Sequence, residues 1–129
     1  MKLEEEARKF MQDRLIITEV MTAELYEAQA GETAIFPKEK ALEYLALGLT
    51  SEAGEVAGKV KKLIRDGEDK EGFELKKIAI SHEIGDVLWY CAMMAKEVGV
   101  PLADIMQENL DKLHSRKARG TLQGSGDDR

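Results

Sequence analysis

The chain has 129 residues, of which 43% are hydrophobic and 34% are charged, so one domain with a modest core is expected. Its formal net charge of −6 argues against broad binding to nucleic acids or to anionic membranes, because both attract cations. A single cysteine, Cys91, excludes a disulfide framework and fits a reducing cytoplasm. The apolar runs are too short to span a bilayer, and the charged start MKLEEEARKF does not read as a signal peptide.

Helical periodicity covers most of the chain, and strand patterns are nearly absent. We expect helices over residues 3–29, 37–65, 73–98 and 102–117, with breaks at the loop 31–36, at Asp66-Gly67 and at Gly99-Val100-Pro101. The last ten residues, GTLQGSGDDR, are polar and rich in glycine, which indicates a mobile tail. The sequence therefore predicts an all-α domain over residues 1–117, followed by a flexible tail over residues 118–129.

Two near-copies of one acidic pattern stand out, Glu52-Ala-Gly-Glu55 and Glu83-Ile-Gly-Asp86. Positions i and i+3 share a helix face, so each pair points two carboxylates in the same direction. If the two helices pack face to face, four carboxylates converge and repel each other unless a hard cation lies among them. The pattern predicts a site for Mg²⁺, with Mn²⁺ as a substitute, and such a site usually serves a phosphate substrate.

Spacing alone is weak support, because several other acidic pairs share it, including Glu24/Glu27 on an amphipathic helix. Only the two chosen pairs have apolar flanks and a glycine between the acids. Glycine inside a helix costs about 1 kcal/mol relative to alanine. We therefore expect Gly54 and Gly85 to allow a close approach of two helices beside the acids.

A basic cluster follows in the last predicted helix, where Lys112 and Arg116 share a face. Basic residues near a helix C-terminus are favoured by the helix dipole and need no ligand. Together with an acidic metal site upstream, the same cluster suits the other side of a triphosphate. Lys59 lies four residues after Glu55, a spacing that ordinary helix stabilisation explains.

These motifs together resemble the MazG-like nucleoside triphosphate pyrophosphohydrolases of the all-α NTP pyrophosphatase superfamily. The similarity rests on EAGE, then EIGD after 27 residues, then NLDKLHSRK, and spans roughly residues 44 to 116. The resemblance implies a four-helix bundle that assembles as a homodimer or homotetramer. It also implies Mg²⁺-dependent hydrolysis of a nucleoside triphosphate to the monophosphate and pyrophosphate, with deoxynucleotides or non-standard nucleotides as substrates.

The resemblance further implies roles for individual residues. Glu52, Glu55, Glu83 and Asp86 match the metal ligands, and one of the glutamates, partly free of metal, would orient or deprotonate the attacking water. The residues expected to bind the substrate are Lys112, Arg116, Asn109, Tyr90, Lys62, Lys117 and Arg119. The single tryptophan, Trp89, argues against the tryptophan cage that holds the base in the dCTP-specific relatives.

Other classes of protein compete with this interpretation. A di-iron helical bundle would need two Glu-x-x-His motifs, and the chain has none. A non-catalytic helical interaction module, or a module that binds magnesium and nucleotide without turnover, remains an alternative. A second apolar set on the first helix, formed by Ile16, Ile17, Met21 and Leu25, is wider than one stripe requires, and it predicts contact with another subunit.

Overall fold

The computed structural model describes residues 5–6, 8–9, 20–67 and 70–129. Within these residues the chain is helical and contains no strand. The elements are α2 (Ala23–Gly31), a 3₁₀ turn η1 (Lys38–Lys40), α3 (Ala41–Asp66), α4 (Lys70–Val98) and α5 (Leu102–Ala118). The expected all-α class is therefore confirmed, while most of the helix predicted over residues 3–29 lies outside the described residues.

Local sequence signals explain where the helices begin and end. The Thr22 hydroxyl caps α2 by accepting a hydrogen bond from the backbone N–H of Leu25 at 3.1 Å. Gly67 and Gly99 follow α3 and α4 with φ of 66° and 75°, a left-handed conformation that glycine adopts without steric cost. Pro101 comes directly before α5. The helix expected from residue 37 begins later, because Lys38–Lys40 form a 3₁₀ turn.

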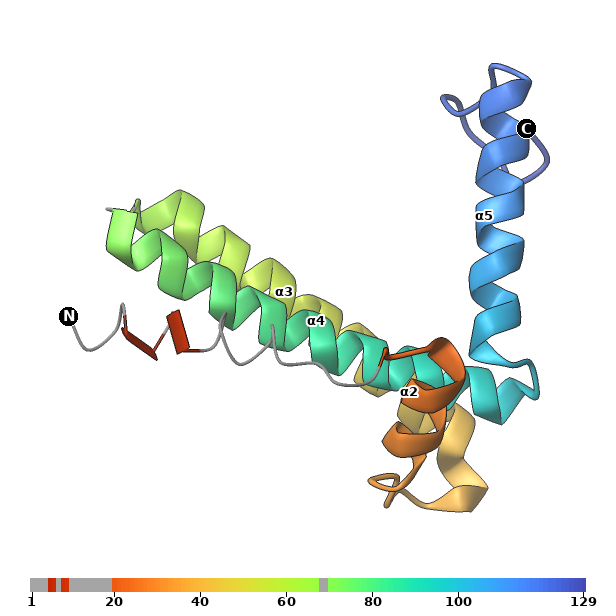
Figure 1. Ribbon diagram of the computed structural model, residues 1–129, viewed down its shortest axis with the longest axis horizontal. Helices are drawn as coiled ribbons and strands as arrows, with labels where there is room; N and C mark the ends of the chain where they lie inside the picture. The colour runs from red at the N-terminus through yellow and green to blue at the C-terminus, as the bar shows by residue number, and fades with distance from the viewer. Residues whose placement is uncertain (1–4, 7, 10–19, 68–69) are drawn as a thin grey trace.

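Helices α3 and α4 lie side by side as a long antiparallel hairpin, and α2 crosses α4 near one end of it (Figure 1). The buried apolar residues gather at this end and are mostly small. They are Ala30, Ala41, Leu45, Ala92, Met93 and Ala95. Leu45 is fully buried, while Leu42, three residues earlier on α3, is 52% exposed.

Trp89 connects α4 to the end of α2. Its indole N–H donates to the Thr33 hydroxyl at 2.8 Å and to the Ala30 carbonyl at 3.2 Å. The ring also packs edge-on against Phe36 and Tyr90. Trp89 is thus partly buried and packs against the core through its ring and its indole N–H.

Helix α5 projects away from the hairpin (Figure 1). It contacts α2 and α4, and none of the described residues joins it to α3. Its first turn is held by Glu27, whose carboxylate accepts a hydrogen bond from the backbone N–H of Leu102 at 3.0 Å. Four helices are present among the described residues, but α5 does not close a bundle with the others within one chain.

Candidate metal centre

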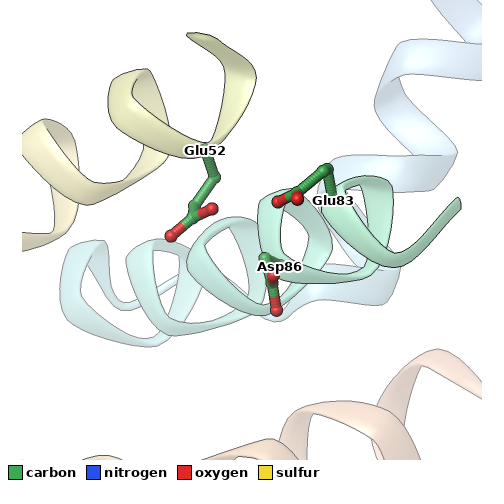
Figure 2. Close-up of side chains that lie close together, drawn as sticks. All are labelled: Glu52, Glu83 and Asp86. Carbon is green, nitrogen blue, oxygen red and sulfur yellow. The ribbon is translucent and has the colours of Figure 1, made fainter. Parts of the chain in front are cut away.

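Three of the four predicted acids come together between α3 and α4. One carboxylate oxygen each from Glu52, Glu83 and Asp86 lies within 4.8 Å of the other two. Figure 2 shows Glu52 reaching from α3 towards α4, which supplies Glu83 and Asp86. Glu52 and Glu83 are partly buried and Asp86 is exposed, so the group lies at the edge of the interface, open to solvent.

Glu55 is not part of this group. Its side chain is exposed, although its charge is close enough to act on Glu52. Partial burial, followed by the charges of Asp86, Glu83 and Glu55, raises the pKa of the Glu52 carboxyl. The charges of the neighbouring acids thus add to the effect of burial on Glu52.

The three carboxylates fit a hard divalent cation. With Mg–O distances of about 2.0–2.1 Å in an octahedron, neighbouring ligand oxygens lie about 3 Å apart and opposite ones about 4 Å apart. Oxygens within 4.8 Å of one another are therefore near the spacing of a single ligand set. Small side-chain rotations of Glu52, Glu83 and Asp86 would bring their oxygens to the spacing of ligands around one metal ion. These residues therefore suit Mg²⁺ or Mn²⁺.

A lysine meets the group from α3. Lys59 Nζ lies 3.0 Å from a carboxylate oxygen of Glu83. We expected Lys59 to pair with Glu55 along the same helix; its ion pair with Glu83 crosses to α4 instead. The crossing follows from the packing, because the side of α3 that carries Lys59 faces the partly buried Glu83.

Two tyrosines lie near the three clustered carboxylates. Burial, the neighbouring Tyr44 hydroxyl and the charges of Glu52 and Asp86 raise the pKa of Tyr90. Burial and then the charge of Asp86 raise the pKa of Tyr26 on α2. Tyr90, expected from the sequence, therefore lies near the carboxylates. Tyr26 also lies near Asp86, and no motif in the sequence indicated it.

The glycines between the acids have a different role from the expected one. A Cβ atom added to Gly54 or Gly85 would meet nothing within 4 Å. The close approach occurs at Gly48, where an added Cβ would overlap the ring of Tyr90. The expectation of helix contact at Gly54 and Gly85 is wrong, because both face outward beside the acids while Gly48 faces α4.

The basic cluster of α5 is not brought to the carboxylates within one chain. Asn109, Lys112, Lys117 and Arg119 are exposed along α5, the helix that projects away from the hairpin (Figure 1). Lys62 is exposed on α3. Its charge acts on Asp66, whose pKa is lowered by a hydrogen bond from Arg65 and by the charges of Lys76 and Lys62.

Arg116 differs from its neighbours because it is buried, with 5% of its surface exposed. The chain after α5 folds back over it, and Arg116 Nη2 donates to the Asp127 carbonyl at 2.7 Å. The Arg116 carbonyl accepts from the Thr121 N–H at 2.8 Å, and Arg119 donates to the Arg129 carbonyl at 3.0 Å. Residues 118–129 thus lie against the end of α5, while the mobility expected of them stays a prediction.

Two comparisons with known proteins found matches that cover more than half of the chain. The MazG nucleotide pyrophosphohydrolase domain matches residues 40–120, the stretch that holds all four acids and the basic cluster. The "Gene 37 protein" of Mycobacterium phage L5 is 43% identical over 117 residues, which cover 84% of this chain and 100% of the phage protein. No solved structure matches the chain. Among the described residues, no helix has the length and apolar character needed to cross a membrane.

Proposed function

Because the chain belongs to the MazG nucleotide pyrophosphohydrolase family, we propose that it hydrolyses nucleoside triphosphates to the monophosphate and pyrophosphate. The observation that supports this proposal is the convergence of Glu52, Glu83 and Asp86 from α3 and α4. Deoxynucleoside triphosphates or non-standard nucleotides are the proposed substrates, in a role that keeps the nucleotide pool clean in the cytoplasm.

In this proposal each acid has a defined task. Glu52, Glu83 and Asp86 would hold Mg²⁺ or Mn²⁺, which would act as a Lewis acid and neutralise charge on the phosphates. Glu55 lies next to the group but outside it, and it either completes the ligand set or acts as the base that orients and deprotonates the attacking water. Tyr90 lies beside Glu52 and Asp86 and contacts the sugar or base.

The phosphate-binding residues come from a second copy of the chain. Lys112, with Asn109, Lys117 and Arg119, is exposed on a helix that leaves its own hairpin (Figure 1). The same helix exposes large apolar side chains, Ile105, Met106, Leu110 and Leu113, by 38–52%. An isolated helix with an open apolar stripe is marginal in water. We therefore propose a homodimer or homotetramer in which α5 of one copy reaches the carboxylates of another.

Arg116 takes part on one condition. Its guanidinium donates to the Asp127 carbonyl and is covered by the chain that follows α5. Arg116 reaches a phosphate only when residues 120–129 move away. Lys62, on α3, contacts the substrate only if the substrate extends along that helix. Lys112 is therefore the first α5 residue to test.

A panel of common and damaged nucleoside triphosphates, assayed with Mg²⁺ for release of pyrophosphate, tests the reaction. Glu52→Gln, Glu83→Gln and Asp86→Asn should each lose about a hundredfold or more in rate, as loss of a group that stabilises developing charge typically does. Glu24→Gln, at the exposed member of the pair Glu24/Glu27, should retain the wild-type rate. Release of phosphate and nucleoside diphosphate would contradict the reaction type, and metal binding without turnover would favour a binding module.

Mixing two inactive variants tests the assembly. Glu52→Gln lacks a metal ligand and Lys112→Ala lacks a phosphate contact, but a mixed dimer holds one intact site if α5 serves the partner. An equal mixture should then recover about a quarter of the wild-type activity, since half of the dimers are mixed and each has one intact site. No recovery, or an active monomer in light scattering, would contradict the shared site.

A further inference from the structure

The pair formed by Lys59 and Glu83 differs from the other ion pairs of the described residues. Lys40–Glu43, Lys77–Glu74 and Arg65–Asp66 are local pairs on exposed surface. Lys59 and Glu83 lie on different helices, and their side chains are only 31% and 17% exposed. An ion pair between two helices that is partly shielded from water is the kind that affects both stability and neighbouring charges.

Besides its ion pair with Lys59, Glu83 lies close to two other acids, because it is one of the three clustered carboxylates. The Lys59 ammonium reduces the repulsion that Glu83 shares with Glu52 and Asp86. A divalent cation among the three carboxylates would lie near the same ammonium, and two positive groups so close repel each other. Lys59 and a metal ion therefore compete for the charge of Glu83.

The length and flexibility of the Lys59 side chain allow it to leave its ion pair with Glu83. Its ammonium is a compact charge on a flexible four-carbon stem, and its position at the edge of a site that is open to solvent leaves room for a change of rotamer. A displaced Lys59 stays within a few ångströms of the carboxylates, where the phosphates of a bound triphosphate would lie. Lysine binds such oxygens as a point charge.

We propose that Lys59 is a positioning residue that holds Glu83 in the metal-free site and turns to the substrate phosphates once a divalent cation takes the carboxylates. This inference rests on the proposed function of the same site. It assigns to one residue two successive partners, a carboxylate and then a phosphate.

Lys59→Met and Lys61→Met form a matched pair of variants. Both remove one positive charge from α3, but Lys61 is exposed and lies two residues further along. Without nucleotide, Lys59→Met should bind Mn²⁺ about two- to fivefold more tightly by calorimetry, the range of one such ion pair. Its metal-free unfolding temperature should fall by about 2–5 °C, and Lys59→Arg should restore it.

The second readout follows the phosphate contact. With saturating Mn²⁺, binding of inorganic tripolyphosphate should weaken about tenfold in Lys59→Met, the loss of one charge-assisted contact, and should not change in Lys61→Met. Equal Mn²⁺ affinity in the two methionine variants, or weaker Mn²⁺ binding by Lys59→Met, would contradict the proposed competition between Lys59 and the metal ion for Glu83. Unchanged tripolyphosphate binding by Lys59→Met would contradict the proposed contact between Lys59 and the substrate phosphates.

These measurements separate the two proposals. Tighter Mn²⁺ binding by Lys59→Met in a protein that hydrolyses no triphosphate would support the role of Lys59 and contradict the proposed function. Hydrolysis by the wild type, together with equal Mn²⁺ affinity in both variants, would contradict the role of Lys59 alone.

Discussion

Replacing Gly48 by alanine tests the contact between α3 and α4 beside the candidate metal centre. An added Cβ would overlap the Tyr90 ring. That ring cannot simply turn aside, because it packs edge-on against Trp89 with centroids 5.0 Å apart and lies next to Tyr44. The two helices must therefore separate slightly, or Tyr90 must leave its position.

The magnitude follows from three contributions. Overpacking costs about 1–3 kcal/mol and a weakened aromatic pair about 0.5–1.5 kcal/mol, while alanine gains about 1 kcal/mol over glycine in a helix. The free energy of unfolding should thus fall by about 0.5–3.5 kcal/mol. Urea denaturation followed by circular dichroism of the metal-free protein measures it.

Gly54→Ala and Gly85→Ala are the controls, since both make the same exchange inside a helix. Nothing lies within 4 Å of the added Cβ at either position, so each variant should gain about 1 kcal/mol from helix propensity alone. A urea midpoint for Gly48→Ala that equals or exceeds those of the controls would refute the reasoning. A stabilised Gly54→Ala that loses turnover would show that substrate or a second subunit comes close to that face.

Three further predictions use other contacts. Glu27→Gln should lower the free energy of unfolding by about 1–2 kcal/mol in thermal melts, because Glu27 accepts a hydrogen bond from the first N–H of α5, whereas the exposed Glu24→Gln should be near neutral. Burial raises the pKa of Cys91, so iodoacetamide at pH 8 should modify it more slowly than in the urea-unfolded chain. Because the unfolded thiol ionises first, the contribution of Cys91 to stability should fall as the pH rises through the ordinary range of a thiol. Because the pKa of Glu52 is raised, a proton competes with the metal at higher pH than at an ordinary glutamate, and Mn²⁺ affinity should rise with pH over the range in which Glu52 ionises.

The helices and their ends were largely predictable from sequence. Apolar spacing and the glycines at positions 67 and 99 placed α3, α4 and α5 to within a few residues of their observed bounds. The 3₁₀ turn at Lys38–Lys40 was not predicted, since its three residues carry no apolar pattern. Short-range signals of this kind fix helices but not how helices cross.

The site was predictable only in part for the same reason. Spacing placed Glu52 and Glu55 on one side of α3, yet a residue three positions on is rotated by about 60° around a helix axis, which here leaves Glu55 exposed beside the group. Which glycine faces the neighbouring helix depends on the same rotation, and it is Gly48 rather than Gly54. Lys59, whose spacing from Glu55 suggested a local pair, binds Glu83 because α4 lies on that side.

The position of the core at one end of the α3–α4 hairpin has a consequence for the dynamics of the hairpin. The buried apolar side chains of the described residues all lie at the α2 end of the hairpin, and none of the described residues of 56–67 or 72–80 is fully buried. Amide hydrogens of residues 88–95 should therefore exchange with solvent through rare global opening, and those near the far end of the hairpin through frequent local opening. Glu52, Glu83 and Asp86 lie between these two regions along α3 and α4. An ion that links them would act as a clamp at the middle of the hairpin and would extend slow exchange outward from the core.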